Sequence, residues 1–209
     1  MNQNNGKNSL GLDKCFEEAN NPIELFKKWF AKAEETEIND PNAVAVATVD
    51  TANQPSVRMV LLKGLSDKGF VFYTNFNSKK GNDLKTNKKS SMCFHWKSIR
   101  RQVRIIGTVE KVTDKEADDY YNSRPYKNKI GAWASSQSQV LKKRDDFLEQ
   151  IQNYEKKYTS NDVPRPPHWS GWRLMPSQIE FWLDGEGRIH ERLNYKKENG
   201  NWKKELLYP

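Results

Sequence analysis

The chain has 209 residues and a formal net charge of +8, and its mean hydropathy of −0.96 indicates a very polar surface. This length fits a single domain. Cysteine occurs only at Cys15 and Cys93, which argues against a disulfide framework and against a cysteine-type metal site. No apolar run is long enough to cross a bilayer, and the first residues lack an apolar signal core. We therefore predict a cytoplasmic protein with no metal and no membrane association.

Lysine pairs recur along the whole chain, from Lys27-Lys28 to Lys203-Lys204. Because they are spread out, they favour a solvated lysine-rich surface over a dedicated nucleic-acid stripe. The sequence also lacks zinc-finger spacing and an RNA-binding aromatic signature. We predict no nucleic-acid partner, and a basic surface for phosphorylated small molecules is the alternative.

The N-terminal residues are Asn-rich and polar, so we predict a flexible arm over 1–20 and one folded domain over 21–209. A first helix is predicted after Asn21, which can cap it, with Pro22 at the first helical position. One face of this helix is apolar and holds Phe26, Trp29, Phe30 and Ala33.

The pattern then changes to short β-branched runs. These predict strands at 42–50, 57–64, 70–75, 91–96 and 101–112. The first three are separated by short turns, which is typical of an antiparallel meander. Between the third and fourth strands, Ser78 is expected to cap a short helix that extends to about residue 88.

The second half of the chain combines helices with strands. Thr113 and Glu116 form a capping box that opens a helix, which is expected to run into YYNSRPYKNKIGAW. A longer helix is predicted over 139–158, with an apolar side made of Val140, Phe147, Leu148, Ile151 and Tyr154. After a proline-rich connector, strands are predicted at 170–175, 178–183, 188–195 and 201–207.

Many antiparallel strands with helices at the periphery indicate a mainly β (α+β) fold. A closed or partly closed barrel is expected, because closure removes exposed strand edges.

Several polar stretches could bind anions. Arg58 and Lys63 share one predicted strand and point to opposite faces, either as strand-end charges in solvent or as two separate anion sites. Ser78, Lys79 and Lys80 begin a helix, whose N-terminus attracts anions, although the glycine pattern of a phosphate-binding loop is missing.

Tyr120 and Arg124 are four residues apart and are therefore expected to be neighbours on a helix. A phenol beside a guanidinium suits phosphate recognition, and an ordinary helix-end stack is the alternative. Gln102 on a strand could read a donor and an acceptor on a heterocycle, or be a common edge-strand amide. Gln137 and Ser138 precede a predicted helix and are further polar contact points.

In the predicted strand 188–195, Arg188, His190 and Arg192 project from one face, and Trp182 precedes the hairpin turn. Like charges on one strand face repel each other, so we expect an anionic or electron-rich group to lie against them. A row that faces solvent is the alternative.

Taken together, these stretches resemble the pyridoxamine 5'-phosphate oxidase family. The resemblance is carried by RMVLLK, FYTNFNSKK, RQVRIIG, YYNSRPYKNKIGAWASSQS, GWRLMPSQIEFW and RIHER, in register from about residue 20 to Pro209. It implies a split β-barrel that binds FMN, usually as a homodimer with two sites at the subunit interface. It also implies oxidation of pyridoxamine or pyridoxine 5'-phosphate to pyridoxal 5'-phosphate, with O2 as acceptor, H2O2 as product and ammonia released from the amine.

The resemblance further implies roles for individual residues. FMN contacts are implied for Arg58, Met59, Val60, Leu61, Lys63, Tyr73, Thr74, Lys79, Lys80, Gln102, Gln137, Ser138, Trp182 and Arg192. Substrate contacts are implied for Lys63, Tyr120, Arg124, Asn128, Arg188 and His190, of which Arg188 and His190 lie against the substrate ring as the catalytic pair. Lys79 stands where the family often has arginine, and Asn128 where a serine often helps to bind the substrate phosphate.

Two other functions are compatible with parts of the sequence. One is a different FMN split-barrel protein, such as a flavin reductase or a haem-handling relative. The implied phosphate ligands Lys63, Tyr120 and Arg124 argue against this function. The other is a non-enzymatic basic module that binds RNA or carries pyridoxal phosphate.

Overall fold

The structure is a computed structural model that describes residues 19–209. Nearly all of the predicted arm over 1–20 therefore lies outside the described residues. The first helix, α2 (Pro22–Thr36), begins as expected, because the Asn21 side chain accepts a hydrogen bond from the Ile23 N–H group. No helix among residues 19–209 has the length and apolar character that a bilayer span requires. The cytoplasmic location stays a prediction.

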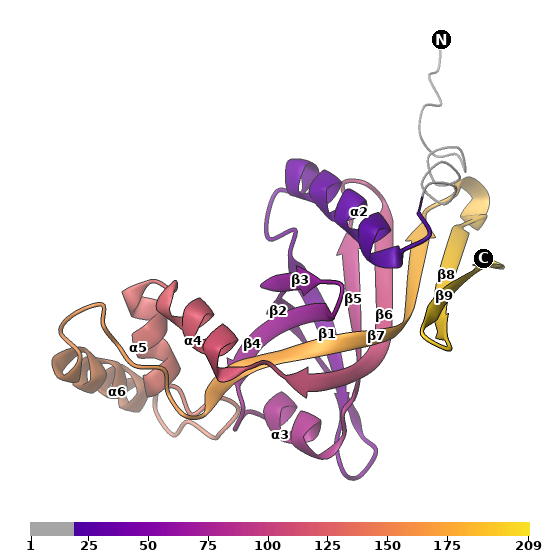
Figure 1. The fold of residues 1–209 in the computed structure, drawn as a ribbon. Coiled ribbons are helices and arrows are strands. Elements are labelled where there is room, and N and C mark those ends of the chain that lie inside the picture. The colour runs from indigo at the N-terminus through magenta and orange to yellow at the C-terminus, as the bar shows by residue number, and fades with distance from the viewer. Residues whose placement is uncertain (1–18) are drawn as a thin grey trace.

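The strands form one antiparallel sheet of nine strands within the described part of the chain. In chain order they are β1 (Ala43–Val49), β2 (Pro55–Leu61), β3 (Gly64–Ser66), β4 (Gly69–Asn75), β5 (Lys89–Trp96), β6 (Arg101–Lys111), β7 (Trp169–Leu183), β8 (Glu191–Glu198) and β9 (Asn201–Leu207). Their order across the sheet is β2-β1-β5-β6-β7-β4-β3, and the β8–β9 hairpin is attached to β7. The sheet curls until β2 contacts β4, which gives a partly closed barrel (Figure 1).

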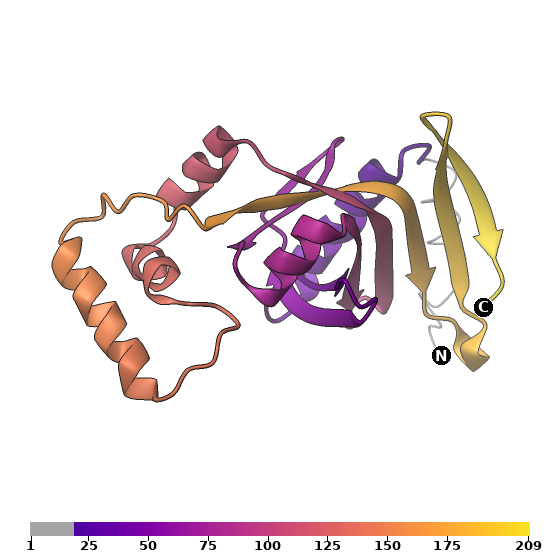
Figure 2. The same ribbon diagram turned by 90° about the horizontal axis from the view of Figure 1, so that it is seen from below.

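The predicted meander is wrong beyond its first hairpin. β1 pairs with β2, but β4 pairs with β3 and with β7. The reason lies in β7, because the two strands predicted at 170–175 and 178–183 are one strand of 15 residues. Its first half pairs with β4, its second half with β8, and β6 pairs along its other edge (Figure 2).

A bulge lets the long β6–β7 pair bend. The register shifts between Ile106 and Gly107, and Gly107 lies opposite Pro176. A Cβ atom on Gly107 would lie 2.0 Å from the Met175 carbonyl oxygen, so only glycine fits this close approach of the two backbones. Proline donates no backbone hydrogen bond, and a bulge is a place where a ladder accepts it.

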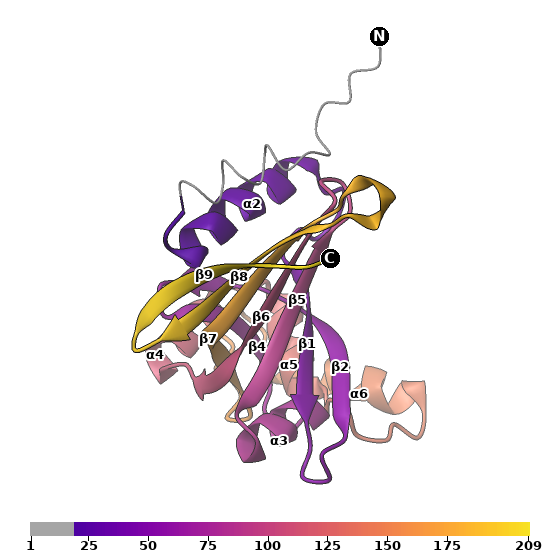
Figure 3. The same ribbon diagram turned by 90° about the vertical axis from the view of Figure 1, so that its right-hand side faces the viewer.

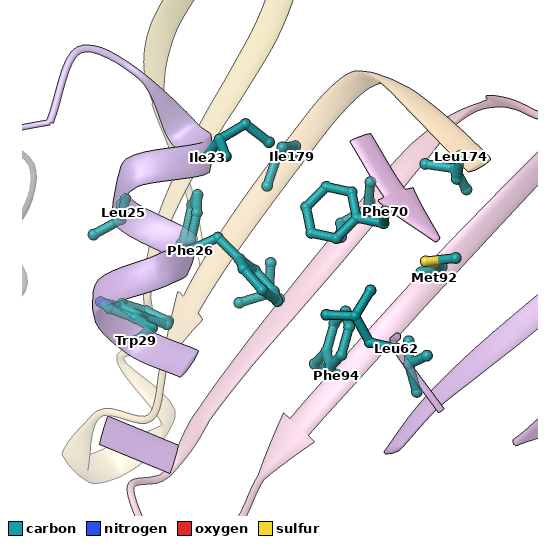
Figure 4. Packing of buried hydrophobic residues seen from close by; sticks show 14 of the residues in the cluster. Ile23, Leu25, Phe26, Trp29, Leu62, Phe70, Met92, Phe94, Leu174 and Ile179 are labelled. Carbon is teal, nitrogen blue, oxygen red and sulfur yellow. The ribbon is translucent and has the colours of Figure 1, made fainter. Parts of the chain in front are cut away.

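Helix α2 covers the inner side of the sheet and completes the core (Figures 3 and 4). Phe26 packs edge-on against Phe70 and Phe94, with ring centroids 4.9 and 5.0 Å apart, and Trp29 packs against Phe181 at 5.1 Å. Burial of such large rings stabilises the fold by roughly 1.5–3 kcal/mol each. The predicted apolar face of this helix is therefore confirmed.

The other helices are α3 (Lys79–Thr86), α4 (Asp114–Asn122), α5 (Tyr126–Ala134) and α6 (Arg144–Lys157). Ser78 caps α3 and the Thr113–Glu116 capping box opens α4, as predicted. Pro125 separates α4 from α5, because proline disfavours helical backbone in the residue before it. α6 is shorter than the predicted 139–158, and its apolar side is not buried within this chain.

The strand predicted at 188–195 begins only at Glu191. Glu186–Arg188 form a 3-10 turn, in which Gly187 and Arg188 have φ values of 63° and 64°. Arg188 and His190 therefore precede the strand that carries Arg192, and the predicted single face is wrong. The turn is closed by the Gly185 N–H group, which donates to His190 Nδ1 at 3.2 Å.

Candidate cofactor and substrate site

A cavity of about 560 Å³ opens where β2 approaches β4, beside α4 and α5. It is lined by Met59, Val60, Leu61, Lys63, Tyr73, Thr74, Asn75, Lys80, Tyr120, Arg124, Lys127, Asn128, Gly131, Ala132, Ser135, Gln137 and Trp169. Among residues 19–209, this lining contains four basic side chains and no carboxylate. Such a cavity attracts anions, and its volume is typical of small-molecule sites.

Lys80 forms the first cationic cluster of the cavity. Its ammonium group donates to Thr74 Oγ1 at 3.0 Å and to Gln137 Oε1 at 3.2 Å. Ser78, the N-cap of α3, lies within 3.5 Å of the same ammonium group. Burial, together with the nearby charge of Arg58, lowers the pKa of Lys80 to about 8. A buried cation with only neutral partners is ready to bind an anion.

Two predicted FMN contacts flank this cluster without lining the cavity. Arg58 is anchored to β1 and β2 by hydrogen bonds to Val46 O at 3.1 Å and to the hydroxyls of Thr48 and Ser56, both at 2.7 Å. The Lys79 ammonium group lies 3.3 Å from each of two carboxylates, those of Asp50 and Asp83. Hydrogen bonds to these carboxylates raise the pKa of Lys79.

A stack of aromatic rings forms the second cluster. Tyr73 packs against both Tyr120 and Trp169, with centroid distances of 4.1 and 5.3 Å, and the Tyr120 and Trp169 rings are 6.1 Å apart. The Arg124 guanidinium lies 4.7 Å from the Trp169 ring centroid, and its Nη1 atom is buried without a hydrogen-bond partner in the described part of the chain. α4 ends at Asn122, so Tyr120 and Arg124 are not a helical pair as predicted, but both line the cavity.

Trp169 was missed by the sequence interpretation, because a tryptophan at the start of a predicted strand is usually a core residue. Its carbonyl accepts from Arg165 Nη1 at 2.9 Å, and Arg165 also pairs with Asp118 on α4. Trp169 therefore links α4, β7 and the Arg124 guanidinium.

One face of α5 completes the cavity. Asn128 lines it together with Lys127, Gly131, Ala132 and Ser135, which recur at the spacing of a helix face. The substrate contact implied for Asn128 stays a prediction. Lys127 was also missed, since a lysine in a lysine-rich chain carries no signal by itself. Ser138 lies outside this cavity, in a neighbouring one of about 410 Å³ that shares Gln137.

A second group of predicted residues lies on β6, β7 and β8. Gln102 is opposite Trp182, and Trp182 is opposite Arg192, so the three side chains form a row on one sheet face. Arg192 Nε donates to the buried Glu180 carboxylate at 2.9 Å, which raises the pKa of Arg192. The His190 ring is 4.7 Å from that of Trp182, and its Nδ1 lies 3.2 Å from Asp184 Oδ1.

This row does not reach the cavity within one chain. Trp169 lines the cavity at the start of β7, whereas Trp182 lies 13 residues further along the same strand, which corresponds to roughly 43 Å of strand length. Most of the predicted site residues therefore fall into two groups. We call those that line the cavity the cavity group, and we call Gln102, Trp182 and Arg192 the β6–β8 row.

Comparisons with known proteins agree with this geometry. Residues 30–183 match the family described as "Pyridoxamine 5'-phosphate oxidase". A protein of Pelagibacter ubique named pyridoxine/pyridoxamine 5'-phosphate oxidase is 63% identical, and the match covers 98% of this chain and 100% of that protein. A protein of Agrobacterium fabrum with the same name is 53% identical over 93% of this chain and 95% of its own.

The chain belongs to the pyridoxamine 5'-phosphate oxidase family. The predicted family, the FMN-binding split barrel and the assignment as an FMN-dependent oxidoreductase are confirmed.

Among solved structures, PhzG of Burkholderia lata in complex with tetrahydrophenazine-1-carboxylic acid superposes with a TM-score of 0.88. It is 28% identical, and the match covers 94% of this chain and 96% of that one. Residues 169–209 match a C-terminal dimerisation region of pyridoxine 5'-phosphate oxidase. This segment contains Trp182 and Arg192 of the β6–β8 row. It also contains Arg188 and His190 of the turn between β7 and β8.

The residues present fit FMN, the cofactor of this family. The cavity offers a desolvated ammonium group on Lys80, the unpartnered Nη1 atom of Arg124 and no competing carboxylate. A phosphate carries about −1.5 to −2 charge near neutral pH, which matches these cations.

Proposed function

We propose that this protein oxidises pyridoxamine and pyridoxine 5'-phosphates to pyridoxal 5'-phosphate, with FMN as cofactor and O2 as electron acceptor. The observation that carries the proposal is one acid-free cavity with two separate cationic clusters. Cofactor and substrate each bring a phosphate, so the reaction requires two anion sites. Lys80 with Thr74 and Gln137 would hold the FMN phosphate. Lys63, Tyr120, Arg124 and Asn128 would hold that of the substrate.

The β6–β8 row completes the site in a homodimer. Gln102 and Arg192 flank Trp182 in register, and Trp182 lies at the far end of β7 from the cavity residue Trp169. They lie on the outer sheet face, which also carries Met59, because Met59, Ala45, Cys93 and Arg104 are paired in register across β2, β1, β5 and β6. A second copy packed on this face would bring its own row against the cavity of the first.

The chemistry is divided between cofactor and protein. Bound FMN supplies a hydride acceptor that returns electrons to O2 as H2O2. The protein would hold the two phosphates at separate cationic clusters and so position the reacting carbon of the substrate for hydride transfer. Arg192 would favour negative charge at the edge of the flavin beside it. Trp182 and the aromatic stack around Tyr73 would keep water away from the reacting carbon.

Arg188 and His190 would position the substrate ring. Both belong to the turn after β7, and Arg188 is held with a left-handed φ of 64°. A bulky residue with positive φ costs energy and often marks a functional site. The turn also sets the His190 ring against that of Trp182, with the ring centroids 4.7 Å apart.

The absorbance spectrum of the purified protein tests the proposal. We expect a flavin spectrum that bleaches when pyridoxamine 5'-phosphate is added without oxygen and returns when air is admitted. A flavin-bound protein inert to both phosphorylated vitamers would instead favour another split-barrel activity, such as flavin reduction. Salt-sensitive RNA binding without flavin would favour a non-enzymatic basic module.

A further inference from the structure

Lys127 is a basic residue of the cavity that the family resemblance does not assign. It lies in the first turn of α5, next to Asn128, and lines the cavity together with Lys63, Tyr120 and Arg124. Its position on the helix therefore places it at the substrate-phosphate end of the cavity. The Lys80 cluster, which holds the other phosphate, belongs to α3 and β4.

The Lys127 side chain has neither an ion pair nor a hydrogen bond with any residue in the described range 19–209. Other lysines of the same region are engaged. The Lys129 ammonium group is buried and donates to the Asn161 carbonyl at 3.0 Å, and Lys115 on α4 pairs with Asp119 at 2.6 Å. Lys127 is thus a cation beside an acid-free cavity, with no protein anion to compete with a ligand.

The space beside Lys127 is open. Gly131 follows one helical turn later on the same face of α5 and also lines the cavity. A Cβ atom at Gly131 would meet no atom within 4 Å. Glycine in a helix interior costs stability relative to alanine, so this residue leaves room for a ligand to approach α5 below Lys127.

We propose that Lys127 is a further phosphate-binding residue, which contributes a third cation to the substrate-phosphate subsite beside Lys63 and Arg124. This inference rests on the proposed function. Lys63 and Arg124 together match the formal charge of a phosphate dianion, and the ammonium group of Lys127 adds a further charged hydrogen-bond donor for its three terminal oxygens.

The test compares phosphorylated and unphosphorylated substrates on the FMN-loaded enzyme. In Lys127→Met, the KM for pyridoxamine 5'-phosphate should rise roughly 3- to 10-fold, because one partly exposed charged contact is lost. The kcat should stay within about twofold, since the contact is made equally before and during the reaction. Inhibition by inorganic phosphate should weaken by the same factor, and kcat/KM for pyridoxamine, which has no phosphate, should not change.

Two variants serve as controls. Lys127→Arg keeps the charge and should restore the low KM. Lys115→Met removes an exposed lysine that does not line the cavity and should leave every parameter at the wild-type value. A wild-type KM in Lys127→Met, or an equal loss with pyridoxamine, would overturn the inference alone. A wild-type enzyme inert to pyridoxamine 5'-phosphate would overturn the proposed function and the inference together.

Discussion

Lys80 is a buried ammonium group whose neutral partners do not compensate its charge. Burial and the charge of Arg58 lower its pKa to about 8. Below pH 8 the group is protonated in the free protein and can bind a phosphate at full strength. A bound phosphate raises the pKa again, so between pH 8 and that higher value binding must take up a proton. Affinity for an anion therefore falls as the pH rises above 8.

We predict that the affinity for FMN falls roughly tenfold between pH 7.5 and pH 9.5, because a charged hydrogen bond is lost. Fluorescence titration of the apoprotein with FMN measures this loss. In Lys80→Arg the guanidinium stays charged throughout, so its affinity should not change over the same range. A wild-type protein with pH-independent affinity would show that Lys80 does not face the FMN phosphate.

Substitutions of Arg58 and Arg188 test cofactor binding and substrate positioning separately. We predict that Arg58→Ala increases the rate of FMN release about 10- to 100-fold, because a charged contact of roughly 1.5–3 kcal/mol is removed. Arg188 is exposed, so Arg188→Leu should change the free energy of unfolding by less than about 0.5 kcal/mol. It should keep FMN and lose turnover. Flavin fluorescence and oxygen uptake measure the two effects, and identical losses in both variants would contradict the division.

The pairing of β6 with β7 depends on one close approach between the two backbones, at Gly107 and Met175. A Cβ atom on Gly107 would overlap the Met175 carbonyl, and the obstacle is backbone, which cannot rotate away. We predict that Gly107→Ala lowers the free energy of unfolding by roughly 2–4 kcal/mol, as measured by urea denaturation. A change below about 0.5 kcal/mol would mean that the bulge relaxes without cost.

Gly131→Ala is the matched substitution on α5 and should have the opposite effect on stability. The added methyl group meets no neighbour, and alanine is the better helix former by about 1 kcal/mol, so the free energy of unfolding should rise. The same methyl group narrows the cavity, so the KM for pyridoxamine 5'-phosphate should increase. Higher stability with an unchanged KM would show that ligands do not approach this part of the helix.

At the scale of the whole molecule, an outer sheet face remains apolar and exposed. Val57 is 67% exposed, Met59 62% and Ile106 40%, and the strands between them carry the small residues Ala45 and Ala47. Ile106, Ser91, Ala47 and Val57 are paired in register, so they lie on one face. Exposed apolar patches of this kind mark interfaces, and the dimerisation region of β7–β9 adjoins this one.

We predict that Ile106→Asp yields monomers that lose FMN, because an unpaired carboxylate would be buried in the interface and the β6–β8 row would no longer reach the partner's cavity. Sedimentation velocity and flavin content measure both outcomes. Ile38→Asp, in the exposed loop after α2, is the control and should remain a flavin-loaded dimer. A monomer that keeps FMN at wild-type affinity would contradict a site completed by the second copy.

The starts of three helices and the family could be predicted from the sequence alone. The Asn21 and Ser78 caps and the Thr113 capping box depend on neighbours within a few residues, so they could be predicted without a fold. Lys63, Tyr120 and Arg124 were predicted from motifs in register, and the structure brings them to one cavity.

The pairing of the strands, and the division of the predicted site residues into two groups, follow from the tertiary structure. Period-2 alternation tells which residues share a face but not which strand lies beside them, so the pairing of β4 with β7 could not be predicted. For the same reason, the sequence could not predict that the Gln102–Trp182–Arg192 row lies far from the cavity. The pKa of Lys80 and the missed residues Trp169 and Lys127 depend on burial and on neighbours from several elements, which no single stretch of sequence contains.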